Sequence, residues 1–187
     1  MRIFKTAGIV AVMVLSATLV QAQAVRVESQ PQLPTSWDWL AGTFWYVGAS
    51  DLPAYLYDTR TQAGAMVPDQ TVFQITESKG GYSRGTAVVE MAMSRTSFTM
   101  LGVVTPDGSV LLDFLPNDAT GAATTGTGRF TYLLGRELTM LNQMSSSPNE
   151  RVKVLHWAYM RRTSPGDASW DRLPGVNVSV PEFLRGR

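Results

Sequence analysis

The chain contains no cysteine and only one histidine, His156, among its 187 residues. The lack of cysteine excludes disulfides, thiol catalysis and thiolate metal sites. A single imidazole also excludes any site that needs two histidine ligands. Net charge is small as well, because 16 basic and 15 acidic residues give +1. Bulk charge therefore predicts no binding to nucleic acid or to an anionic membrane surface.

The N-terminus has the three parts of a secretory signal peptide. Arg2 and Lys5 precede an apolar run, and the small residues that follow it fit cleavage after Ala22 or Ala24. The run is shorter than the roughly 20 residues of a membrane-spanning helix, although a retained N-terminal anchor is the alternative. We expect a periplasmic or secreted protein with no stable membrane span after cleavage. Removal of residues 1–24 leaves 14 basic and 15 acidic residues, a net charge of −1.

The sequence lacks any long stretch of helical periodicity, which argues against crossover βαβ units. Short runs of Val, Thr, Phe, Tyr and Met instead alternate with Gly, Asn, Asp and Pro, which is typical of an all-β meander. Turn chemistry with glycine marks residues 79–81, 106–108 and 135–136. We predict eight strands, at 43–47, 71–77, 83–93, 97–104, 109–115, 127–134, 137–143 and 151–162.

Eight antiparallel strands form a closed barrel or a sandwich, and a barrel of this size holds side chains or one small ligand. The predicted fold is an all-β, eight-stranded antiparallel up-and-down barrel with a short N-terminal helical turn and an irregular C-terminal tail. Residues 25–35 are a linker, 36–163 the barrel and 164–187 the tail. We expect Trp170 to pack this tail on the barrel exterior.

Two predicted loops are long for a compact domain. Residues 48–70 contain Tyr55, Tyr57 and Met66, which would form a lid over the barrel mouth or simply cover it. Residues 116–126 are small and polar and indicate a flexible segment.

Side chains alternate between the two faces of a strand, so charged residues mark the outer face. On the last strand Arg151, Lys153 and Arg161 face water, which turns His156 inward. Leu155 and Trp157 lie on that outer face, under the tail or the first turn. The expected inner set is Gly85, Ala87, Val89, Met91, Met93, Phe98, Met100, Gly102, Val110, Leu112, Phe114, Phe130, Tyr132, Leu134, Leu138, Met140, Asn142, Met144, Val152, Val154, His156, Ala158 and Met160.

Such a lining is mostly Met and aromatic with few polar points, which is typical of a small-molecule cavity. The small inward residues Gly85, Ala87, Gly102 and Ala158 favour open space. The alternative is a filled core in which methionine plugs irregular gaps. That alternative corresponds to an envelope scaffold with no internal space.

His156 supports several chemical interpretations. Three roles are open for it. It is a buried residue hydrogen-bonded to Tyr132 or Asn142, a general acid or base, or a haem ligand. Met91, Met93 and other inward methionines also resemble a thioether copper site, although packing is the commoner role. One histidine without a paired inward carboxylate argues against a hydrolytic triad.

The segment Leu40-Ala41-Gly42-Thr43-Phe44-Trp45-Tyr46 resembles the lipocalin-like proteins of the calycin superfamily. In that family a helical turn precedes G-x-W on the first strand. Here Phe44 takes the Trp place, with Trp45 beside it. The resemblance spans residues 36–163. It implies an aromatic plug at one end of the barrel, crossed by a basic residue, Arg161 or Arg162, and binding or transport of a hydrophobic ligand.

The function predicted from these features is an exported lipocalin-like protein that binds or carries a hydrophobic small molecule, without a cofactor or a metal. The alternative is an isomerase or cyclase on the same barrel, in which His156 moves a proton and Tyr132 steadies the developing charge. The predicted ligand-binding residues are Tyr46, Tyr55, Tyr57, Phe73, Met91, Met100, Phe114, Tyr132, Asn142 and His156.

Overall fold

The computed structural model describes residues 31–117, 123–134, 136–147, 149 and 151–185. The expected signal peptide and most of the linker lie outside these residues. Among the described residues, no helix is long and apolar enough to cross a bilayer. The elements are η1 (Asp38–Leu40), β1 (Thr43–Val47), η2 (Ala49–Asp51), β2 (Pro53–Asp58), β3 (Ala63–Lys79), β4 (Tyr82–Met91), β5 (Ser94–Val104), β6 (Ser109–Pro116), β7 (Thr124–Leu133), β8 (Glu137–Ser146), β9 (Val152–Thr163), α1 (Ala168–Asp171) and α2 (Val180–Leu184).

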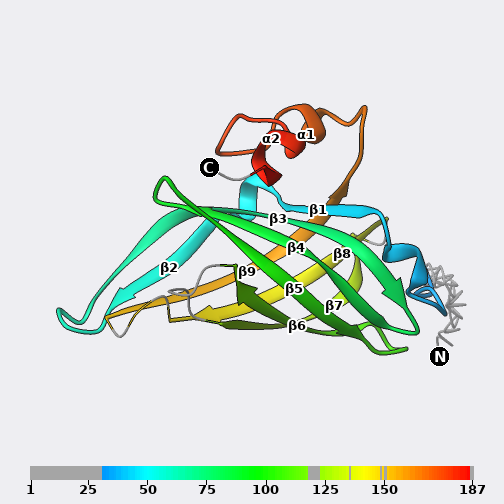
Figure 1. Ribbon diagram of the computed structural model, residues 1–187, viewed down its shortest axis with the longest axis horizontal. Helices are drawn as coiled ribbons and strands as arrows, with labels where there is room; N and C mark the ends of the chain where they lie inside the picture. The colour runs from blue at the N-terminus through cyan, green and yellow to red at the C-terminus, as the bar shows by residue number, and fades with distance from the viewer. Residues whose placement is uncertain (1–30, 118–122, 135, 148, 150, 186–187) are drawn as a thin grey trace, which may run out of the picture.

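The strands form one closed antiparallel sheet (Figure 1). Neighbours follow the chain from β3 to β9, and β1 and β2 both pair with β3 on one side and with β9 on the other. These two short strands therefore share one position in the wall. The barrel has eight strand positions, which confirms the predicted fold class.

The prediction of a loop at residues 48–70 is wrong. This segment contains β2 and the first half of β3, which form a hairpin at one end of the barrel. The strand period was present in the sequence, because Tyr55 and Tyr57 alternate with Ala54 and Leu56, but the proline and glycine residues obscured it. The segment expected to be flexible is also shorter, since β7 already begins at Thr124; residues 118–122 lie outside the described chain.

Among the described residues, three hairpin turns use residues other than glycine in the left-handed region, and the β2–β3 turn does so with Gln62 at φ 55°. Gly80 and Gly81 have φ of 59° and 84°, as the turn chemistry predicts. The β4–β5 turn instead places Ala92 and Met93 at φ of 49° and 67°. Met93 is consequently 97% exposed, not inward. Leu134, at φ 51° in the β7–β8 turn, is likewise exposed, so both inward assignments are wrong.

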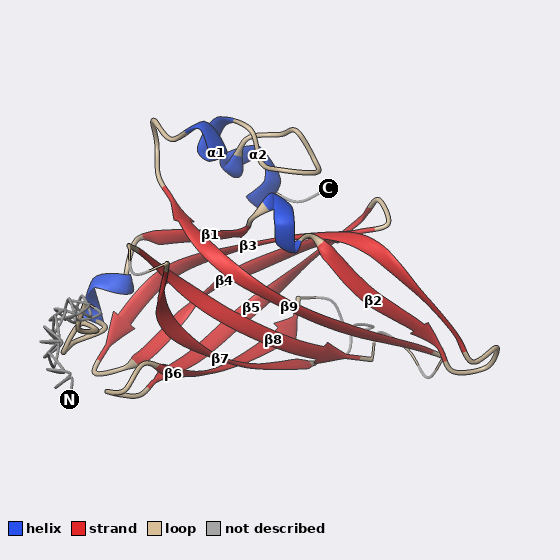
Figure 2. Ribbon diagram, turned by 180° about the vertical axis from the view of Figure 1, so that it is seen from behind, coloured by secondary structure: helices blue, strands red, loops and turns tan. Residues whose placement is uncertain are grey.

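Figure 2 shows η1 at one end of the barrel, here called the plugged end. Aromatic side chains fill this end. Trp37 stacks on Phe130 with ring centroids 4.5 Å apart, and its Nε1 donates to the carbonyl of Thr105. Trp45 is fully buried against the same Phe130 ring. The plug residue on β1 is therefore Trp45.

Phe44, which was expected at the plug position, faces outward and packs edge-on against Trp170, 4.9 Å between centroids. Arg162 is the partner of Trp45 in the β1–β9 register, so the two residues leave the sheet on the same face. Arg161 pairs with Tyr46 and therefore lies on the opposite, outer face of the sheet. Its Nη1 is 3.9 Å from Glu137 Oε2. That Arg162 packs across Trp45, as the resemblance implies, stays a prediction, since Arg162 is exposed.

The C-terminal tail folds over the outer face of β3 and β4 (Figure 1). Leu173, Val180 and Phe183 pack against Val72 and Val88 in a second hydrophobic cluster. Trp170 joins that cluster, which confirms its predicted role, and the tail holds the two short helices α1 and α2. Buried apolar area of this kind stabilises at about 25 cal/mol per Å².

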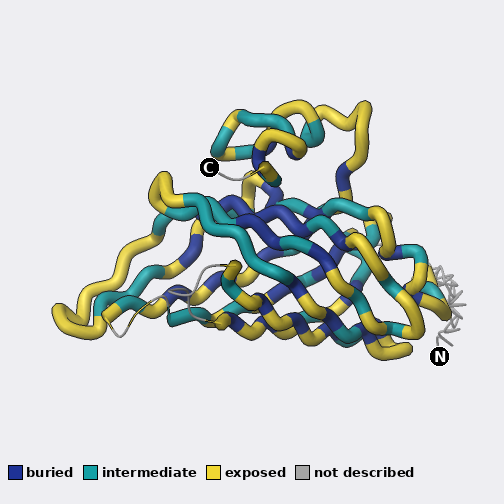
Figure 3. The backbone as a smooth tube through the Cα atoms, viewed as in Figure 1, coloured by how far each residue is buried: buried dark blue, intermediate teal, exposed yellow. Residues whose placement is uncertain are grey.

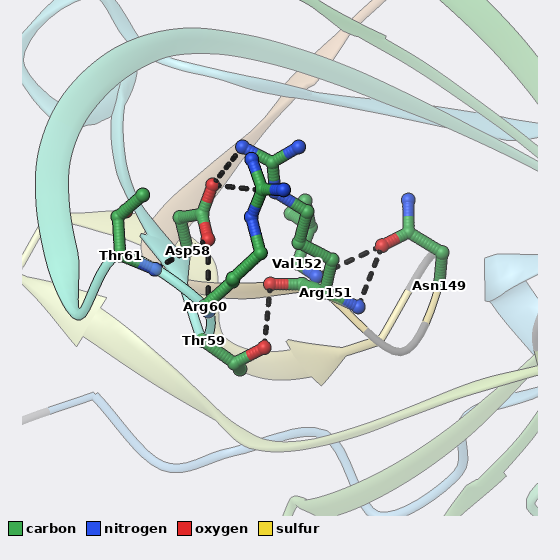
Figure 4. A network of polar contacts seen from close by, with 7 residues as sticks. All are labelled: Asp58, Thr59, Arg60, Thr61, Asn149, Arg151 and Val152. Atoms are coloured by element: carbon green, nitrogen blue, oxygen red, sulfur yellow. Dashed lines mark hydrogen bonds and ion pairs between the residues drawn. The ribbon is translucent and has the colours of Figure 1, made fainter.

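The opposite end of the barrel is here called the hairpin end. There, polar contacts join the end of β2 to the start of β9 within the barrel wall (Figure 4). Asp58 accepts from Arg151 Nε at 2.7 Å and from the backbone of Arg60 and Thr61. The Arg151 hydrogen bond, with the backbone donors, lowers the pKa of Asp58 to about 2. Asn149 accepts from the backbone of Arg151 and Val152. This network holds the β2–β3 hairpin against the start of β9.

The small inward residues do not leave open space in the plugged half. A Cβ on Gly85 would collide with the backbone carbonyl of Gln74, and one on Gly102 would meet Ser83 Oγ and Leu112. These glycines are therefore needed for close approach of neighbouring strands. Burial is greatest where β3, β4 and β5 pass the middle of the barrel, and the hairpin end is the most exposed (Figure 3).

Candidate functional site

The barrel wall is interrupted where β1 ends and β2 begins. The last β1–β9 pair is Val47 with Met160, and the first β2–β9 pair is Tyr55 with Leu155. Between these pairs, residues 156–159 of β9 face the η2 turn instead of a strand. Polar groups that a ladder would have paired must therefore bond elsewhere.

Side chains take over these hydrogen bonds. The Gln70 amide accepts from the Val47 N–H and donates to the Val47 carbonyl, both at 3.1 Å, as a neighbouring strand would. Its Nε2 also donates to the Pro174 carbonyl of the tail at 2.9 Å. Asp51 Oδ2 accepts from the Tyr159 N–H at 3.0 Å. The interruption is thus closed by specific polar contacts.

His156 and Asp69 form a buried ion pair beside this interruption. Nδ1 of His156 lies 3.1 Å from Asp69 Oδ2, and the two side chains are 5% and 2% exposed. Nε2 of the same ring lies 2.7 Å from the Asp51 carbonyl oxygen. Thr71 Oγ1 donates to the other Asp69 oxygen at 3.1 Å. The pair therefore ties β9 to β3 and to η2.

The hydrogen-bond partners determine the charge of His156. A carbonyl oxygen only accepts, so Nε2 must carry a hydrogen, and a carboxylate requires a hydrogen on Nδ1. Burial alone lowers the pKa of His156, but the hydrogen bond and charge of Asp69, together with Asp51, outweigh burial and raise the pKa above the ordinary 6.5. Both ring nitrogens thus face acceptors, and this arrangement favours the imidazolium form.

An imidazolium held in this way has no free lone pair. It cannot take a proton from a substrate or coordinate a haem iron without giving up one of its two bonds. Among the described residues, no three His, Asp or Glu side chains gather as metal ligands would. The geometry thus argues for a positioning or structural role of His156.

A small cavity adjoins the pair. It has room for about one water molecule. Its lining combines His156, Thr71 and Asn142 with the apolar residues Val47, Met144, Ala158 and Met160. Asn142 is 4% exposed, and its Oδ1 has no hydrogen-bond partner in the described part of the chain.

Three of the predicted ligand-binding residues belong to a filled core. Phe73 and Met100 are 0% exposed, and Phe114 is 2% exposed. These three residues belong to the packed core of the plugged half, which corrects the expectation that they line open space.

Tyr132 faces inward at the plugged end, far from His156. It pairs with Leu138, whereas His156 pairs with Met144, six residues further along β8 and about 20 Å away. Its hydroxyl is 3.5 Å from the Gln32 carbonyl. The expected partnership of Tyr132 with His156 is therefore wrong, and Asp69 takes that place.

Three other predicted residues lie on the outer face. Tyr55 and Tyr57 stack on each other, 6.4 Å between centroids, outside the wall. Tyr46 packs under the C-terminal tail. Leu155 and Trp157, expected to be covered, are 50% and 59% exposed. None of the three tyrosines points into the barrel. Tyr46 was expected to face inward, whereas Tyr55 and Tyr57 were expected in a loop over the barrel mouth and lie on strand β2 instead.

The inward side chains of the hairpin half differ from those of the plugged half. Leu56, Val67, Met91, Phe98 and Met144 share the inner face with His156, as the strand registers show, yet each is only half-buried. Solvent therefore reaches apolar inner surface in this half of the barrel, above the His156–Asp69 pair. Met91, Asn142 and His156 are the predicted residues that the structure places in this region.

Asp69 was missed because it lay in the predicted loop. The inward orientation of Asp69 could have been predicted from the sequence, because inward and outward side chains alternate along β3. The inward set there is Asp69, Thr71, Phe73 and Ile75. No family model matches this chain, and neither a curated protein nor a solved structure is significantly similar to it. The closed eight-position barrel is compatible with a lipocalin-like fold.

Proposed function

We propose that this protein is an exported, lipocalin-like binder that holds an apolar small molecule in the hairpin half of its barrel. The site would consist of the half-buried inner surface, with the His156–Asp69 pair and Asn142 at its base. The change from a solid core to half-buried apolar side chains along one inner face supports this proposal above all. Such a surface, with few polar groups, suits a small hydrophobic ligand.

A binder fits the geometry better than an isomerase or cyclase. An enzyme of that kind needs a base whose lone pair reaches the substrate. Both nitrogens of His156 instead face acceptors, and Tyr132 lies at the other end of the barrel. We therefore assign no catalytic role to these two residues.

Binding of an uncharged fluorescent probe, N-phenyl-1-naphthylamine, tests the proposal. Met144→Trp places a large ring beside the cavity and should weaken binding of the probe. Leu115→Trp, on the outer face at 43% exposure, is the matched control and should bind like the wild type. Equal affinity of the three proteins, or no saturable binding at all, would refute a site inside the barrel.

Export is part of the proposal and has its own test. The full chain expressed in a bacterial host should appear in the periplasm or medium with a new N-terminus at Gln23 or Val25, following cleavage after Ala22 or Ala24. Mass spectrometry of the purified protein identifies the terminus. A protein that keeps Met1 and stays with the membrane fraction would support the retained anchor instead.

A further inference from the structure

The cavity beside His156 contains an unsatisfied hydrogen-bonding group. Asn142 comes from the inner face of β8, is nine-tenths buried or more, and leaves its Oδ1 without a partner in the described chain. Buried polar atoms are normally bonded, so such a group indicates a missing water or ligand atom. Gly126 keeps space beside this oxygen, because a Cβ there would lie 3.0 Å from Oδ1.

The other two polar side chains of the lining, Thr71 and His156, already form hydrogen bonds. Thr71 gives its proton to Asp69, so its oxygen can only accept from the cavity. Both N–H groups of His156 bond to Asp69 and Asp51. A ligand atom that supplies a hydrogen to Asn142 or Thr71 would therefore complete the site.

Size and charge narrow the class of ligand. Room for about one water fits one oxygen atom and not the two oxygens of a carboxylate. A carboxylate would also lie near the buried Asp69. An ammonium needs three acceptors and would face the imidazolium of His156, which lines the same cavity. A buried ion without a partner is strongly disfavoured.

Access to the cavity comes from the hairpin half. Met144 lines the cavity and is also half-buried, so it connects the polar pocket with the apolar surface that solvent reaches. Met160, Ala158 and Val47 close the side toward the plugged end, where all three are buried. A ligand in the hairpin half would therefore present one end to Asn142.

On the basis of the proposed function, we infer that the ligand is an uncharged apolar alcohol whose hydroxyl occupies this cavity and donates to Asn142 Oδ1. The hydroxyl would replace the water that otherwise fits there. The apolar part of the molecule would lie against Met144, Met91 and Leu56. The recognised class is then a long-chain or polycyclic alcohol, in preference to a fatty acid or an amine.

Headgroup discrimination by the full mature protein tests this inference. Binding of 1-decanol, decanoate and decylammonium is measured by calorimetry at pH 7. The wild type should bind 1-decanol about tenfold more tightly than the two ions, the factor expected when a hydrogen bond is made and no charge is buried. Asn142→Leu should lose the preference for the alcohol, whereas Met144→Leu, which changes the same lining without its polarity, should keep it.

Other outcomes separate the inference from the proposed function. If decanoate or decylammonium binds as well as 1-decanol, the hydroxyl site is refuted, while an apolar binding function stands. If none of the three binds, both fail. If Asn142→Leu does not fold, Gly126→Ala replaces it, because its Cβ would crowd Asn142 Oδ1 and should reduce affinity for the alcohol. Unchanged discrimination in that variant would overturn the inference.

Discussion

Removal of one partner of the buried ion pair tests the role assigned to His156. His156→Leu leaves the Asp69 carboxylate at 2% exposure with Thr71 as its remaining side-chain donor. Breaking a buried pair in this way costs about 3–5 kcal/mol. Asp69→Leu should cost a similar amount, because it leaves the imidazolium without its counter-charge. The free energy of unfolding is measured by urea denaturation monitored by tryptophan fluorescence.

The double variant distinguishes a true pair from two independent residues. Asp69→Leu combined with His156→Leu removes both charges, so its cost should be smaller than the sum of the single costs by roughly 2 kcal/mol or more. Additive costs would show that the two side chains do not interact. Circular dichroism of each variant shows whether the barrel is retained.

The pH dependence follows from the raised pKa of His156. Below pH 6.5 the imidazole is protonated in both the folded and the unfolded chain, and its contribution to stability is fully present. That contribution is lost as the pH rises through the higher pKa of the folded state. The stability difference between wild type and His156→Leu should therefore shrink at alkaline pH.

The same chain allows a direct measurement, because His156 gives the only imidazole signals in an ¹H–¹⁵N spectrum of the side chains. Both ring nitrogens should show the shifts of protonated nitrogen at pH 7. A neutral tautomer at pH 7, together with a stability difference that does not change with pH, would refute the assigned imidazolium.

Three further predictions concern the tail, the ion pair between β2 and β9, and the contact between β3 and β4. Phe183→Ala should remove about 3–5 kcal/mol of tail packing, with a lower melting temperature and faster proteolysis of the tail, since Phe183 is fully buried under Arg95. Asp58→Asn should leave the urea midpoint at pH 7 nearly unchanged, because exposed ion pairs contribute little to stability. In the wild type, NMR titration should place the pKa of Asp58 at about 2. The ion pair with Arg151 is then lost only as the pH falls through that value. Gly85→Ala should strongly destabilise the barrel in the same urea assay, because its Cβ would collide with a backbone carbonyl of β3.

Alternation along the strands predicted much of the inner face. On β9 the outward Lys153 placed His156 inside, and on β8 the same period placed Asn142 and Met144 beside it. The period is a local property of each strand, so it can be read from the sequence without knowledge of partners. It failed at Met93 and Leu134, where the chain turns with residues that have no turn preference.

The partners of His156 could not be predicted, because they depend on closure of the barrel. Asp51 and Asp69 lie in a segment whose prolines and glycines suggested a loop. They meet His156 only because β1 and β2 close the barrel between β3 and β9. Without Asp69 the charge of the imidazole cannot be determined. The proposed roles of proton carrier and haem ligand arose from that gap.

The interrupted wall explains why polar groups are buried at this level of the barrel. A continuous first strand would pair residues 156–159 of β9 by backbone bonds, and an apolar inner face would then suffice. Because η2 leaves the ladder, Asp51, Gln70 and His156 must supply bonds through side chains. Buried pairs of this kind seldom add more stability than apolar residues would. Their effect is to fix a polar base beneath an apolar surface, and the proposed recognition of a hydroxyl group depends on this arrangement.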